Sequence, residues 1–88
     1  MKIYKYLLEV TDEQVLELPK NAGILSVAEQ NGNIVLYAMV NPEMHTEKIR
    51  IAIIGTGHEI PRPQDLDRFV GTVKQRGGLL MWHVFVMR

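Results

Sequence analysis

Residues 24–40 contain the strongest local constraint on the fold of this chain. The dipeptide Asn31-Gly32 separates two largely apolar segments, 24–30 and 34–40. Asn and Gly tolerate the positive φ angles that both central residues of a type I′ turn require, and this turn matches the right-handed twist of paired strands. The segment therefore predicts a β-hairpin with a two-residue loop.

The loop length also predicts how the two strands pair. Val27 is expected opposite Leu36, and Leu25 opposite Ala38, because a slip of one residue would turn both hydrophobic side chains of the first strand to the other face. The second strand is apolar on both faces, which is typical of a central strand that is covered on both sides.

The remaining chain consists of further short strands separated by turn residues. Apolar side chains alternate along the first of them, and at most one short helical turn, at 64–68, interrupts the pattern. These features predict an all-β fold, a small antiparallel sandwich or partly open barrel of about seven short strands, in a single domain over residues 1–88. The strands are expected at 3–10, 15–18, 24–30, 34–40, 48–54, 69–75 and 79–87.

Two more hairpins follow from this assignment. Segments 3–10 and 15–18 are expected to pair with each other, and so are segments 69–75 and 79–87. If Gly77 and Gly78 form the loop of the last hairpin, His83 lies opposite Thr72, where a hydrogen-bonded or half-exposed histidine is expected.

Composition argues against several classes of function. Ten basic residues balance ten acidic residues along the chain, so nucleic acid and anionic membranes are disfavoured as partners. The chain has no cysteine, and its three histidines lack the spacing of a local metal site, so no metal or cofactor is expected. The N-terminus does not have the pattern of a signal peptide, and no segment approaches the roughly 20 apolar residues that span a bilayer. We therefore expect a cytoplasmic protein.

The apolar segment before Gly55 and Gly57 has a superficial likeness to the first strand and turn of a dinucleotide-binding fold. That fingerprint needs a third small residue and a helix after the glycines. Here Ile60 occupies the third position, and prolines 61 and 63 follow. The glycines are therefore interpreted as a tight or bulged exit from a buried strand.

The same loop, residues 55–63, is nevertheless the best candidate for a ligand site, because it is the longest irregular stretch and glycines let a ligand approach the backbone. His58 would supply the polar contact, and the nearby backbone amides would bind an anion. The alternative is that the loop has only an architectural role, with His58 bonded to a neighbouring carbonyl group. The candidate ligand-binding residues are Thr56, Gly57, His58 and Glu59.

The last strand carries more apolar surface than one core readily covers. Trp82 is expected to be mostly buried, on the face that packs against segment 34–40. The other face predicts self-association, most simply as a homodimer. The contact would be made through Met81, Phe85 and Met87 or through an exposed sheet edge.

Four segments of the chain resemble a family of small uncharacterised proteins from tailed bacteriophages and bacterial prophages. These segments are 3–6 together with 9–14, then 18–27, 54–58 and 82–85, and the resemblance extends over almost the whole chain. It implies a phage or prophage setting in a bacterial host cell, but no activity and no site residues.

Together these observations favour a non-enzymatic accessory protein that binds a small ligand or a host or phage protein, because a neutral domain this short has little room for a deep pocket. One alternative is a small enzyme or nucleotide-binding domain that uses the His58 loop. The other is a structural component of the virion or of its assembly.

Overall fold

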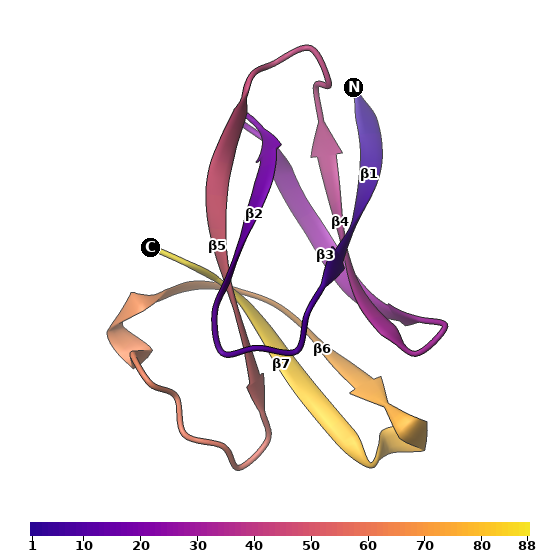
Figure 1. Ribbon diagram of the computed structural model, residues 1–88, viewed down its shortest axis with the longest axis vertical. Coiled ribbons are helices and arrows are strands. Elements are labelled where there is room, and N and C mark those ends of the chain that lie inside the picture. The colour runs from indigo at the N-terminus through magenta and orange to yellow at the C-terminus, as the bar shows by residue number, and fades with distance from the viewer.

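The computed structural model describes every residue from Met1 to Arg88 and consists mainly of β-strands (Figure 1). The helical elements are two short 3₁₀ turns, η1 (Pro63–Asp65) and η2 (Arg76–Gly78). The all-β fold class and the seven strands expected from the sequence are confirmed. The strands are β1 (Lys2–Leu8), β2 (Gln14–Pro19), β3 (Gly23–Gln30), β4 (Asn33–Val40), β5 (Thr46–Gly55), β6 (Leu66–Gln75) and β7 (Leu80–Met87).

The strands form two antiparallel sheets. One sheet has the order β1-β4-β3 and the other has the order β2-β5-β7-β6. The two sheets approach each other where the edge strand β3 lies against the edge strand β6, whereas β1 and β2 lie at the opposite edges of their sheets. The result is a two-layer sandwich that is not closed into a barrel (Figure 1).

The core lies between the two sheets, because each sheet turns one apolar row toward the other. Burying an aliphatic side chain of this size contributes about 1.5–3 kcal/mol, so these rows are the main source of stability. The row from β4 includes Leu36, Ala38 and Val40, and the facing rows of β5 and β7 include Ile51, Ile53 and Val84.

The outer face of β4 is less covered than the sequence predicts. Val35 is buried there, but Tyr37 is half-buried and Met39 is 42% exposed. The expectation of complete cover on both sides is therefore wrong for this end of the strand. The reason is that the fold has only two layers, so the outer face of this sheet has no third layer to pack against.

The β3–β4 hairpin confirms the two-residue loop. Asn31 and Gly32 both have positive φ angles, 53° and 85°, and Val27 pairs with Leu36 as predicted. The pairing of Leu25 with Ala38 is wrong, because a register shift between Ile24 and Ser26 places Ile24 opposite Ala38. This bulge leaves Leu25 43% exposed and lets Ile24 enter the core.

Strands β1 and β2 do not form the expected hairpin. Strand β1 pairs with β4, and β2 pairs with β5 in the other sheet, so the connection between them crosses from one layer to the other (Figure 1). The side-chain amide of Gln14 takes the place of strand pairing at this crossing. It donates a hydrogen bond to the carbonyl oxygen of Glu9 (2.6 Å) and accepts one from the backbone N–H of Glu9 (3.0 Å).

The last hairpin has the predicted pairing but a longer turn. Thr72 lies opposite His83, as expected, and the last pair of the ladder is Gln75 with Leu80. The turn therefore contains four residues, including η2, in place of the two glycines alone. The helical turn expected at 64–68 occurs at Pro63–Asp65, and β6 begins directly after it.

Side chains fasten β3 to β6 where the two sheets meet. Arg68 donates a hydrogen bond to the carbonyl oxygen of Ile24 (3.0 Å), and Gln75 donates one to the carbonyl oxygen of Gly32 (2.8 Å). The bond from Gln75 holds the tip of the β3–β4 hairpin beside the β6–β7 turn, and the bond from Arg68 joins the starts of β3 and β6.

Candidate functional site

One end of the sandwich gathers four connections, and it is the best candidate for a functional site. These connections are the β1–β2 crossing, the β3–β4 turn, the loop from β5 to η1, and the β6–β7 turn, all in the lower half of Figure 1. Residues from all four line cavities that border Trp82. We call this region the loop end.

Trp82 is the central side chain of the loop end. It is partly buried and packs against the core, as the sequence predicts, but part of its surface stays open to the cavities. Its indole N–H donates a hydrogen bond to the side-chain oxygen of Gln75 (2.7 Å). The amide of Gln75 is itself bonded to the carbonyl oxygen of Gly32 (2.8 Å). Two hydrogen bonds in series therefore fix the orientation of the ring.

His58 lies against the edge of Trp82. The ring centroids are 6.1 Å apart and the planes meet at 69°, a favoured edge-to-face arrangement. A tight turn places the imidazole here, because the backbone N–H of His58 donates to the carbonyl oxygen of Gly55 (3.0 Å) and Gly57 has a φ of 83°. Gly55 is required for close contact, since a Cβ atom there would lie 2.6 Å from Nδ1 of His58.

The imidazole of His58 borders three of the cavities. Their volumes are about 360, 340 and 270 Å³, and Trp82 also lines the first two. The His58 ring makes no hydrogen bond within the chain, so the expected bond to a neighbouring carbonyl group is not made by the side chain. Both ring nitrogens are free to contact a ligand.

The loop does not offer the pair of backbone amides that was expected to bind an anion. The N–H of Thr56 is already used in a hydrogen bond to the carbonyl oxygen of Met81 (3.2 Å). Gly57 keeps a free N–H, but a single amide is a weak anion site. Of the four candidate ligand-binding residues, Thr56, Gly57 and His58 border cavities, whereas Glu59 lines none.

Sequence reasoning missed two features of the site. It did not foresee that Gln75 fixes Trp82, because the contact depends on the longer β6–β7 turn. It also did not foresee that Thr56 reaches His83 on the outer face of the β2-β5-β7-β6 sheet, where the hydroxyl oxygen lies 2.7 Å from Nε2. The pairing of Thr72 with His83 was the one available signal that His83 has hydroxyl partners.

The expected interface residues do not form one exposed surface. Met87 is only 7% exposed and packs with Ala52 and Ile54. Phe85 is half-buried and its ring lies 5.3 Å from that of Phe69, which is 55% exposed. Met81 is 36% exposed. The accessible apolar surface on this face therefore comes mainly from Phe69.

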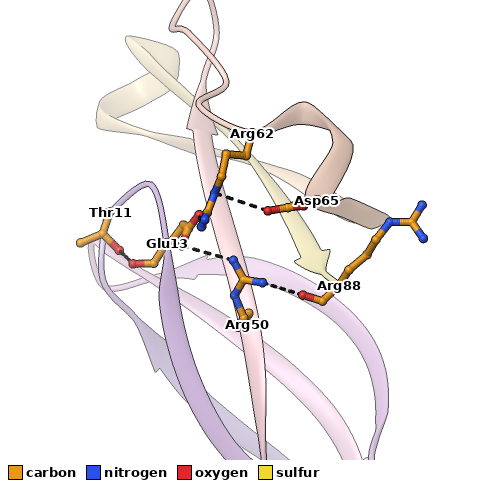
Figure 2. Close-up of polar contacts among 6 residues, drawn as sticks. All are labelled: Thr11, Glu13, Arg50, Arg62, Asp65 and Arg88. Carbon is orange, nitrogen blue, oxygen red and sulfur yellow. Dashed lines mark hydrogen bonds and ion pairs between the residues drawn. The ribbon is translucent and has the colours of Figure 1, made fainter.

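A cluster of charged side chains connects the loop end to the rest of the molecule (Figure 2). Glu13, in the β1–β2 crossing, forms an ion pair with Arg62 of the loop and another with Arg50 of β5 (3.4 Å). Arg62 also pairs with Asp65 (3.4 Å), and Arg50 donates a hydrogen bond to the carbonyl oxygen of Arg88 (2.6 Å). We call this group the Glu13 cluster. It joins the crossing, the loop and the C-terminal residue.

The two arginines change the acidity of the carboxyl group between them. The hydrogen bond from Arg62 is the largest cause, and the positive charges of Arg62 and Arg50 add to it, so the pKa of Glu13 is lowered from its ordinary value. A carboxyl group whose pKa is lower in the folded state stabilises that state at every pH above its unfolded pKa of about 4.3. This stabilisation is lost as the pH falls through the lower, folded pKa.

We predict that Glu13→Gln lowers the free energy of unfolding at pH 7, because it removes the negative charge between Arg50 and Arg62. The difference between wild type and variant should shrink as the pH falls below about 4, where the wild-type carboxyl group becomes protonated as well. Urea unfolding at neutral and acidic pH measures both values. Glu43→Gln is the control, because Glu43 is exposed and forms no ion pair. A Glu13→Gln difference that is independent of pH would contradict the role of the cluster.

The fold brings together no group of three or more histidine, aspartate or glutamate side chains with the geometry to hold a metal ion. Neither of the two helical turns is long and apolar enough to cross a bilayer.

Comparison with known proteins gives one family. No curated protein and no solved structure matches the chain. The model of a family described as "Domain of unknown function (DUF7352)" matches residues 1–88, the full length of the chain. The chain therefore belongs to the DUF7352 family.

Proposed function

We propose that this protein is a small binding module whose non-catalytic ligand site is the loop end around Trp82 and His58. One observation carries the proposal: a partly buried tryptophan, fixed by Gln75, shares its cavities with a histidine whose ring nitrogens have no partner. Binding sites commonly combine apolar and aromatic walls with a few polar groups that set the orientation of the ligand.

The composition of the walls supports a small, flat, uncharged ligand. Leu79, Leu80 and Met81 supply apolar surface beside Trp82 and His58 in the largest of the cavities that contain His58. The charged residues around Trp82 have both signs, since Glu29 and Arg76 line one of its cavities and Asp12 lines another. Such a mixture gives no net field for a phosphate or a nucleic-acid backbone. An aromatic ring can stack on Trp82 and accept or donate one hydrogen bond at His58.

The setting of this function is part of the proposal. The resemblance of segments such as 54–58 and 82–85 to phage and prophage proteins supports a role inside a bacterial host cell. The two rival functions stay open to test: a small enzyme or nucleotide-binding domain at the His58 loop, and a structural part of a virion.

Fluorescence tests the ligand site directly, because Trp82 is the only tryptophan in the chain. Titration with adenosine or benzamide, two uncharged flat compounds, is expected to change the Trp82 emission in a saturable way. Glucose and phosphate should leave it unchanged. His58→Ala should weaken the response about threefold to tenfold, as expected for the loss of one hydrogen bond, whereas His45→Ala, at an exposed position outside the cavities, should not.

Two outcomes would contradict this assignment. One is an unchanged Trp82 emission with both flat compounds up to about 10 mM. A dissociation constant above this concentration corresponds to a binding free energy of less than about 3 kcal/mol, which is too weak for a specific site. The other is an equal response in wild type and His58→Ala.

We also propose that the protein self-associates at the edge strand β6, through the end that carries Phe69 and not through the middle of the strand, where Thr72 lies opposite His83. The support is that Phe69 contacts Phe85 and yet remains 55% exposed. Sedimentation should show a dimer at about 100 μM, and Phe69→Ser should shift it toward monomer. A wild-type protein that stays monomeric at this concentration would rule out the interface.

A further inference from the structure

Three polar side chains lie together on the outer face of the β2-β5-β7-β6 sheet, on the opposite side of β7 from Trp82. His83 is in the middle, on β7. Thr72 lies directly opposite it on β6, and Thr56 is the first residue after β5, which is the neighbour of β7 on its other side. Strand order therefore brings two hydroxyl groups to one imidazole from segments far apart in the sequence.

Both nitrogens of His83 are within hydrogen-bond distance of a hydroxyl oxygen. Nε2 lies 2.7 Å from Oγ1 of Thr56, and Nδ1 lies 3.0 Å from Oγ1 of Thr72. When the ring proton is on Nδ1, the imidazole donates to Thr72, and Nε2 accepts the hydroxyl proton of Thr56. A hydroxyl group bonded to a base, with the base oriented by a third group, is the arrangement that activates a nucleophile.

The surroundings of Thr56 complete such a site. The next residue, Gly57, has a φ of 83° and a backbone N–H that makes no hydrogen bond within the chain, so it can donate to an oxyanion that forms beside Thr56. A cavity of about 270 Å³ adjoins the hydroxyl group and His83, with Ile54 and Phe85 among its walls. Its size and apolar walls fit a short hydrocarbon chain.

We propose that Thr56 is a nucleophile that accepts an acyl group from esters of short apolar carboxylic acids. His83 is its general base and Thr72 is a positioning residue. This activity goes beyond ligand binding at Trp82 and does not depend on it, because its general base His83 lies on the opposite face of β7 from Trp82. The two sites share lining residues, since Thr56 and His58 border the cavity beside Trp82 as well as the cavity beside His83.

The reaction has two balanced steps. Oγ1 of Thr56 bonds to the carbonyl carbon while its proton passes to Nε2 of His83. The bond to the alcohol oxygen then breaks, and the alcohol leaves with that proton. This leaves an ester on Thr56 and a neutral imidazole. In the second step water attacks the same carbonyl carbon, with His83 again as base, and releases the carboxylic acid and free Thr56.

The test uses the full-length protein with p-nitrophenyl butyrate. Intact mass and peptide mapping after a short incubation are expected to show one butyryl group on Thr56, with release of p-nitrophenol. Thr56→Val and His83→Gln should slow the release about 100-fold or more, the usual contribution of a positioned base. Thr72→Val should slow it less, and Thr72→Ser should restore it because the hydroxyl group returns. Thr46→Val, at an exposed threonine outside the cavity, should have no effect.

Butyryl groups on lysines or the N-terminus, with none on Thr56, would overturn the proposal and leave the three side chains as a structural hydrogen-bonded row. Equal rates in wild type and Thr56→Val, or in wild type and His83→Gln, would overturn it as well. Melting curves show whether each variant folds, and mapping on the wild type decides the question even if a variant does not.

Discussion

The hydrophobic contact between the two sheets is the interaction on which the rest of the structure depends. Leu36 and Val40 of β4 are fully buried against the facing row that includes Ile51 and Val84, and without this contact neither sheet has a second layer. The same contact sets the positions of the strand ends. It therefore determines that connections from both sheets meet around Trp82, so the candidate ligand site is a consequence of how the two layers pack.

Local sequence was sufficient for the parts of the fold that local chemistry controls. Asn31-Gly32 predicted its turn and the pairing of Val27 with Leu36, because both turn residues accept positive φ angles. The same reasoning failed at Leu25, because the strand contains a bulge there. The bulge is favoured because it buries Ile24 in the core, and the alternation of side chains along a regular strand gives no sign of it. The β1–β2 hairpin failed for a similar reason, since each strand finds its partner in a different layer.

The candidate sites were less predictable, because they depend on strand order. The loop with His58 could be selected from its glycines and prolines, and it does border the cavities. The contact of Trp82 with Gln75 depends on the β6–β7 turn. The contact of Thr56 with His83 depends on the pairing of β5 with β7. The ion pair between Glu13 and Arg62 joins residues 49 positions apart in the sequence. Sequence alone does not show which residues meet in such contacts.

The packing of the two sheets holds Trp82 in a fixed orientation at the loop end. Nuclear magnetic resonance of the single indole N–H measures this most directly. A fixed ring, bonded to Gln75 and next to Gly32 and His58, should give slow exchange of the indole hydrogen with solvent. It should also give nuclear Overhauser effects to Gln75 and His58. Rapid exchange with no such effects, in a protein that is otherwise folded, would contradict the account.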